Sequence, residues 1–78
     1  MSDKEQRITS YVSGYGLRVY EVEQYHKDSD AWYLVGDCSE NLEYVKAIVE
    51  KHNAGLGLRT IHFMDMFKNE YGHTVTMA

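Results

Sequence analysis

Two segments rich in hydrophobic residues, with only imperfect hydrophobic–polar alternation, lie in the first half of the chain and have the composition of β-strands. Leu17–His26 is rich in β-branched and aromatic residues, and Ala31–Gly36 follows after a short turn of Asp and Ser residues, so both segments predict strands. The alternation is interrupted at Glu21, which predicts either a bulge or a sheet with one weakly buried face. Upstream, Arg7–Val12 fits a third strand that pairs through Gly14–Gly16, with a short helix as the competing interpretation.

A helical period begins after Ser39, which we expect to be the N-cap. A capping box from Asp37 to Glu40 is the alternative start of the helix. The apolar stripe of this helix, closed by a histidine, consists of Leu42, Val45, Ile48, Val49 and His52. We expect Asn53 or Gly55 to end the helix in a left-handed conformation.

The C-terminal part of the chain fits two patterns. Leu58–Met64 has the composition of a strand, whereas a helical spacing is also present in Ile61, Met64, Phe67 or Lys68, and Tyr71. We favour a strand, followed by a turn and a short strand at His73–Met77. The predicted fold class is therefore α+β, a small antiparallel β-sheet of three to five strands with an N-terminal meander and one amphipathic helix packed on one face. Residues 1–78 are expected to form a single domain, and whether residues 1–7 are ordered stays open.

The distribution of charge along the chain bears on whether the partner is a nucleic acid or a protein. The formal net charge is −4, but residues 20–44 alone hold seven acids and one base, Lys27. Proteins that bind nucleic acids normally present basic patches, because contacts with phosphates supply most of their affinity. We therefore expect no direct binding of DNA or RNA and favour a basic protein partner. The alternative is that these carboxylates only keep the chain soluble.

Residue types that carry catalysis or bind metals form no recognisable motif. The four histidines lie on different predicted elements and are His26, His52, His62 and His73. A site assembled in space from His62, His73 and Asp65 is the remaining enzyme or metal-protein alternative. Cys38 lacks the flanking signature of a nucleophile, and Asp28–Asp30 lacks the later ligands of a calcium loop. We predict no catalytic residue, no metal and no cofactor.

The sequence also bears on location. One cysteine, Cys38, excludes an internal disulfide and fits a reducing compartment. The longest apolar run, Ala31–Gly36, is far shorter than a membrane span, and the charged residues 1–7 have no apolar stretch behind them. We therefore predict a cytoplasmic protein without membrane contact.

Aromatic residues are frequent and lie close to the acids. They make up 13% of the chain, more than a thin two-layer core encloses, and Tyr and Trp beside charged surface are typical anchors of protein–protein contacts. The competing interpretation is that they fill the core and the sheet faces as strand formers, and we assign Trp32 to the core. The predicted partner-binding residues are Tyr20, Glu21, Glu23, Tyr25, Asp28, Asp30, Tyr33 and Asp37.

In its size, its acidic segment Glu21–Glu43 and its set of Tyr20, Tyr25 and Tyr33, the chain resembles the small inhibitors encoded by phages and other mobile elements, anti-CRISPR proteins among them. The resemblance covers no defined motif. It implies a non-catalytic inhibitor, acting in the host cytoplasm, whose acids stand in for phosphates in the basic groove of a host defence or nucleic-acid-handling protein. The alternative is a homo-oligomeric structural or accessory domain, a homodimer for instance, that pairs through strand edges at Leu17–His26 or His73–Met77.

Overall fold

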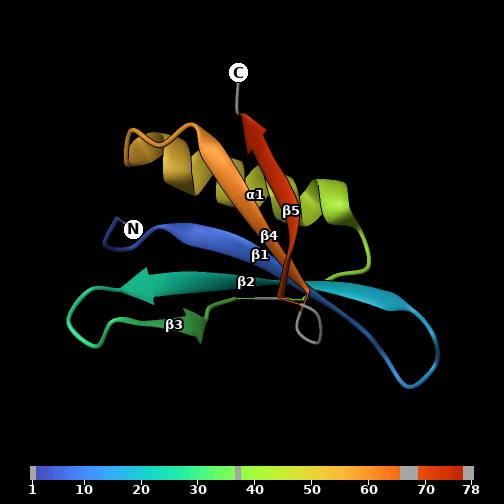
Figure 1. Cartoon of the computed structure of the whole chain (residues 1–78). Helices are drawn as coiled ribbons and strands as arrows, with labels where there is room; N and C mark the ends of the chain where they lie inside the picture. Colours follow the sequence, from blue (N-terminus) through green and yellow to red (C-terminus); the bar gives the residue numbers. More distant parts are fainter. Residues whose placement is uncertain (1, 37, 66–68, 77–78) are drawn as a thin grey trace.

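The described residues form one sheet with one helix against one of its faces (Figure 1). The computed structural model describes residues 2–36, 38–65 and 69–76. The elements in chain order are β1 (Gln6–Val12), β2 (Arg18–His26), β3 (Ala31–Leu34), α1 (Leu42–Gly55), β4 (Thr60–Asp65) and β5 (Asn69–Thr76). The α+β class and the single helix packed on a small sheet are confirmed.

The predicted strands are all present, with bounds shifted by a few residues. Arg7–Val12 lies in β1 and most of Leu58–Met64 in β4, so the helical interpretations of these two segments are wrong. β2 pairs with β1 in a regular antiparallel register from Arg18 to Gln24. No bulge interrupts that ladder at Glu21, so the broken alternation reflects a weakly buried sheet face.

The sheet is mixed, which corrects the expectation of a wholly antiparallel one. Its strand order is β3-β2-β1-β4-β5, and the pairs β1–β2, β2–β3 and β4–β5 are antiparallel. The pair β1–β4 is parallel, with Ile8 opposite Phe63. β3 runs parallel to β1, because each is antiparallel to β2. The connection from β3 to β4 contains α1, which crosses the sheet, and β4 therefore also runs parallel to β1.

The helix begins at Asn41 rather than at Ser39. The side-chain Oδ1 of Asn41 accepts a hydrogen bond from the N–H of Tyr44 at 3.3 Å, which is the N-cap contact. Ser39 does not cap the helix because its backbone is paired with the β2 residue Tyr20, through N–H to O bonds of 2.8 and 2.9 Å. The alternative start at Asp37 falls on a position outside the described residues.

The C-terminal end of α1 also differs from the expectation. The helix runs through Asn53 to Gly55, and the left-handed conformation belongs to Gly57, with φ +80°. We expected His52 to meet the last helical carbonyls. Its Nε2 instead donates to the carbonyl oxygen of Lys4, at 2.7 Å, and so ties the helix end to the N-terminal segment.

The apolar core lies between α1 and the facing side of the sheet. Its buried members are Ile8, Val22, Val45, Val49, Ile61 and Phe63. The helix contributes Val45 and Val49, whereas Ile48 of the same predicted stripe is 40% exposed. Consecutive helical residues point about 100° apart, so a stripe centred on Val45 and Val49 leaves Ile48 at its border.

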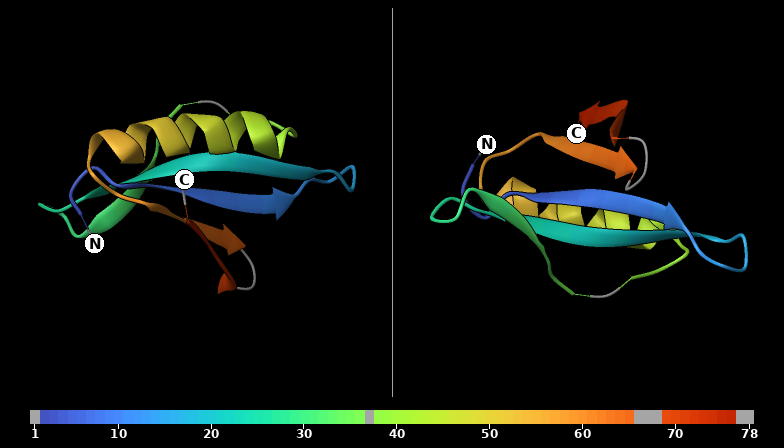
Figure 2. Two further views of the ribbon diagram at one scale, coloured as in Figure 1. Left: turned by 90° about the horizontal axis from the view of Figure 1, so that it is seen from above. Right: turned by 60° about the horizontal axis from the view of Figure 1, so that its bottom comes forward.

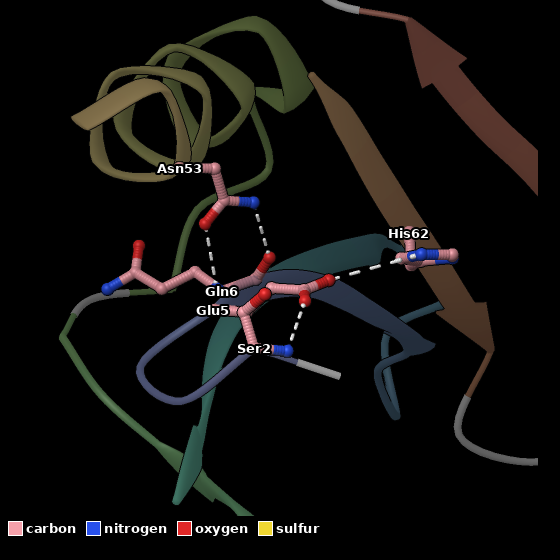
Figure 3. Close-up of polar contacts among 5 residues, drawn as sticks. All are labelled: Ser2, Glu5, Gln6, Asn53 and His62. Atoms are coloured by element: carbon pink, nitrogen blue, oxygen red, sulfur yellow. Dashed lines mark hydrogen bonds and ion pairs between the residues drawn. The ribbon is translucent and has the colours of Figure 1, made fainter. Parts of the chain in front are cut away.

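At the start of β1, the side chain of Asn53 makes the hydrogen bonds that a neighbouring strand would otherwise make. The pairing of β1 with β4 starts at Ile8, so the backbone of Gln6 has no β4 partner on that side. The side-chain Oδ1 of Asn53 accepts from the N–H of Gln6, and its Nδ2 donates to the C=O of Gln6, both at 2.8 Å (Figure 3). Asn53 is fully buried, and this pair of bonds satisfies two backbone groups that would otherwise be orphaned.

The N-terminal residues that precede β1 are hydrogen-bonded to the rest of the fold. Lys4 N–H donates to the carbonyl of Tyr25, and Tyr25 N–H donates to the carbonyl of Glu5, at 2.9 and 2.8 Å. Asp3 Oδ1 accepts from the N–H of Lys27 at 2.9 Å, and this bond holds the pKa of Asp3 below its ordinary value. The segment thereby lies beside the turn between β2 and β3.

Candidate functional site

Strand pairing sorts the side chains of the sheet onto two faces. Residues directly opposite each other in a ladder share a face, so the registers of β1, β2 and β3 define one set toward α1 and one set on the far face. In the left view of Figure 2, α1 lies on one side of β1 and β2, and β4 and β5 extend on the other. The far face of β1, β2 and β3 carries Arg7, Thr9, Tyr11, Val19, Glu21, Glu23, Tyr25, Trp32 and Leu34.

The centre of the far face is a stack built on Arg7. Its guanidinium binds the carboxylate of Glu23, with Nη2 and Nε at 2.6 and 2.7 Å from Oε1. The same guanidinium lies over the ring of Trp32, with Cζ 4.1 Å from the ring centroid, and Trp32 packs against Tyr25 at 5.4 Å between centroids. The carboxylate of Glu23 is therefore ion-paired within the fold.

Glu21 is held on the same face by Tyr11. Partial burial raises the pKa of the Tyr11 phenol, and the hydrogen-bonded Glu21 carboxylate raises it further. The Tyr11 phenol beside Glu21 is therefore neutral at physiological pH.

A second group of acids lies at the turn between β2 and β3. Asp28 and Asp30 are exposed there, and Asp30 adopts a left-handed conformation with φ +49°. The Tyr25 hydroxyl donates a hydrogen bond to Asp30 Oδ1, and the Tyr33 hydroxyl donates to Ser29 Oγ at 3.1 Å. The turn therefore gathers two carboxylates and two tyrosine hydroxyls at one end of the sheet.

The contact between Tyr25 and Asp30 has a measurable consequence. The hydrogen bond to Asp30 raises the pKa of Tyr25, so replacing Asp30 by asparagine is expected to lower that pKa toward the ordinary value of about 10. Because the folded-state pKa is the higher one, the contact stabilises the fold below the unfolded-state pKa and stops doing so as the pH rises through the folded-state pKa. NMR titration of ring-labelled tyrosine measures the shift, and an unchanged Tyr25 pKa in Asp30→Asn would contradict the assignment.

Two predicted tyrosines lie away from the acids of the far face. Tyr20 and Tyr33 point to the α1 side of the sheet, since they alternate with Glu21 and Trp32 along their strands. Tyr20 is half-buried and packs against the core, so it serves the fold. Tyr33 lies at the border of the sheet, 49% exposed, with its ring edge-on to His26 at 5.0 Å between centroids.

The predicted acids also differ in their surroundings. Glu23 is ion-paired and Glu21 is bonded to a tyrosine, whereas Asp28 and Asp30 are exposed at the turn. Asp37 lies outside the described residues. The structure therefore brings together Tyr25, Asp28, Asp30 and Tyr33 around the turn, and separates them from the half-buried Tyr20.

Sequence reasoning missed the residues that organise the far face. Arg7 was noted only as the start of a strand, and Trp32 was assigned to the core although it is only partly buried on the far face. The opposite charges of Arg7 and Glu23 were an available signal, because facing residues of opposite charge favour one strand register. That signal can be used only once β1 is taken as the partner of β2.

The histidines whose side chains the structure describes, His26, His52 and His62, contact different groups, and the predicted grouping of His62 with His73 and Asp65 falls partly outside the described side chains. Glu5 accepts from the N–H of Ser2 at 3.1 Å, and its other carboxylate oxygen lies 4.0 Å from His62 Nε2 (Figure 3). His26 and His52 contact different groups elsewhere, and His73 lies in β5, whose side chains are not described. Among the described residues no group of three or more His, Cys, Asp or Glu side chains is placed to hold a metal ion.

Comparison with protein-family models, with curated proteins and with solved structures found no match. In the described part of the chain no helix is both long and apolar enough to cross a membrane.

Proposed function

We propose that this chain is a non-catalytic protein–protein interaction module that binds a basic protein partner. The observation that carries the proposal is a segregation of charge, since residues 28–45 contain five acids and no Lys, Arg or His. The described part of this segment runs from the β2–β3 turn along β3 and into the first turn of α1. We use the name acidic edge for β3 together with the exposed acids of this segment, which are Asp28, Asp30, Glu40 and Glu43.

Aromatic side chains beside the acidic edge support the same proposal. Tyr25 and Tyr33 reach the turn that carries Asp28 and Asp30, and Tyr33 and Leu34 are well exposed. Tyrosine supplies a large, rigid contact area together with a polar tip, which is why it is enriched at protein interfaces. Carboxylates around such anchors favour basic partners and speed their association.

The finer proposal is inhibition of a nucleic-acid-handling protein. A row of exposed carboxylates on a small folded domain offers a basic groove the same charge as a phosphate backbone. In this view the acidic edge occupies the groove and excludes the nucleic acid, as the resemblance to phage-encoded inhibitors implies. Glu23 takes no direct part, because Arg7 already neutralises it.

A matched pair of charge variants tests this proposal. Asp28→Lys with Asp30→Asn changes the net charge by three units at the β2–β3 turn, and asparagine tolerates the left-handed conformation of Asp30. Val12→Lys with Tyr15→Lys and Leu17→Lys makes the same change at exposed positions near the opposite end of β2. In nuclease-treated bacterial lysate we expect the wild type and the control to capture the same nucleic-acid-handling protein at low salt, and the turn variant to lose it.

Mass spectrometry identifies the captured protein, and addition of duplex DNA or RNA to the purified pair should displace this chain. Equal capture by both variants, or capture that survives high salt, would contradict the acidic-edge proposal. Recovery of the bait alone, at twice its monomer mass on a sizing column, would favour the homo-oligomeric alternative.

A further inference from the structure

Among the described residues, no strand pairs with β3 on the side away from β2. β3 is the last strand in the order β3-β2-β1-β4-β5, and Figure 1 draws no described element beyond it on the side away from β2. Edge strands in proteins are usually protected by lysines, prolines or bulges. β3 has the sequence Ala-Trp-Tyr-Leu, with no charge and no proline, and Tyr33 and Leu34 are 49% and 60% exposed.

The direction of the free backbone groups follows from the pairing with β2. The N–H of Val35 donates to the carbonyl of Val22 at 3.0 Å, so Val35 faces β2. The backbone N–H and C=O groups of successive residues alternate in direction along a strand. Those of Tyr33 therefore point toward β2, like those of Val35, and those of Trp32 and Leu34 point toward the free border. These groups form a short ladder that an additional strand can use.

The charges near this ladder favour one kind of added strand over another. Asp28 and Asp30 lie before β3 and Glu40 lies after it, and no base occurs between residues 28 and 45. A second copy of the chain would bring the same acids against each other, which disfavours self-pairing. A basic segment in extended conformation would instead meet acids at both ends of the ladder.

We propose that an extended, lysine- or arginine-rich segment of the partner adds to the sheet as a strand beside β3. The inference rests on the proposed function and gives it a binding mode: backbone bonds from Trp32 and Leu34 supply register, and the flanking carboxylates select basic side chains. Tyr33 and Leu34, on opposite faces of β3, provide contact area for alternate side chains of the added strand.

The variant Leu34→Pro tests whether binding depends on backbone hydrogen bonds of β3 or only on its side chains. The Leu34 N–H points away from β2, so Leu34→Pro removes an outward donor and blocks close approach while the β2 ladder is kept. Leu34→Ala is the matched control, because it also loses the side chain but keeps the N–H. The probe is a fluorescein-labelled peptide of alternating lysine and valine, with its affinity read by fluorescence anisotropy.

We expect Leu34→Pro to bind this peptide about tenfold more weakly than Leu34→Ala does. Hydrogen exchange followed by NMR should slow at the amides of Trp32 and Leu34 when the peptide is added to the wild type, with little change at Tyr33. A peptide methylated at the backbone nitrogens of one edge should not bind, and this arm needs no protein variant to fold. Equal binding by Leu34→Pro and Leu34→Ala, or unchanged exchange at Trp32 and Leu34, would overturn strand addition.

The two proposals fail in different ways. If Asp28→Lys with Asp30→Asn weakens peptide binding while Leu34→Pro matches Leu34→Ala, the acidic edge binds its partner without an added strand, and only the binding mode is refuted. If neither variant has an effect, the proposed function fails as well. A dimer of the free chain that Leu34→Pro dissociates would assign the edge to a second copy and overturn the inference.

Discussion

Replacing Asn53 by alanine is expected to lower the free energy of unfolding by about 2–6 kcal/mol, because two buried backbone groups each lose their partner at about 1–3 kcal/mol. Asn53 is fully buried, and its carboxamide accepts from the N–H and donates to the C=O of Gln6. A domain of this size is stabilised by only about 4–12 kcal/mol in total, so the loss is a large part of the whole. Urea denaturation followed by circular dichroism measures it.

Two further variants interpret the result. Asn53→Asp keeps an acceptor for the Gln6 N–H but loses the donor to the Gln6 C=O, so it should fall between the wild type and Asn53→Ala. Asn41→Ala removes another asparagine amide, the exposed N-cap of α1, and should cost only about 1 kcal/mol. A cost for Asn53→Ala no larger than that of Asn41→Ala would show that β1 does not depend on the Asn53 bonds.

Replacing Ile8 by alanine is the second change with a large expected effect. Ile8 lies in the central strand β1, is fully buried and belongs to the core between the sheet and α1. Removal of its side-chain carbons leaves a cavity that the neighbouring strands and helix fill only in part, which costs about 2–5 kcal/mol. The same denaturation experiment measures this loss.

The control for Ile8→Ala is Ile48→Ala on the helix. Ile48 is 40% exposed and alanine is the better helix former, so we expect a change within about 0.5 kcal/mol. Similar losses from both variants would mean that α1 is rotated relative to the sheet from the orientation described. Such a result would also question the assignment of Val45 and Val49 to the core.

Much of the fold could be predicted because the signals are local. The strand β2 is rich in β-branched and aromatic residues, the helix α1 carries its own periodicity, and the turn before β3 carries its own Asp and Ser residues. The helix boundaries were less accurate. Ser39 has the chemistry of an N-cap, but its backbone is taken by Tyr20, a residue distant in the sequence, and the cap therefore passes to Asn41.

The sequence indicates which residue types lie in the region of the candidate site but not how they are arranged. The sequence placed acids and tyrosines in the same region, and alternation along β2 separated Tyr20 from Glu21 and Glu23. It could not tell which acids are neutralised, since the partner of Glu23 is Arg7, on another strand. The exposed acids that remain are those of the turn and of the approach to α1.

The sequence by itself determined the strands β2 and β3, the central part of α1, the α+β class and the concentration of acids between residues 20 and 44, because these depend on neighbouring residues and on composition. Only the tertiary structure decided the parallel pairing of β1 with β4, the bond of Asn53 to Gln6 and the position of β3 at the border of the sheet. Each of these depends on register and on contacts between residues far apart in the chain, where many alternatives satisfy the same local pattern. The negative charge of the acidic edge therefore follows from the sequence, whereas its position at the border of the sheet follows from the fold.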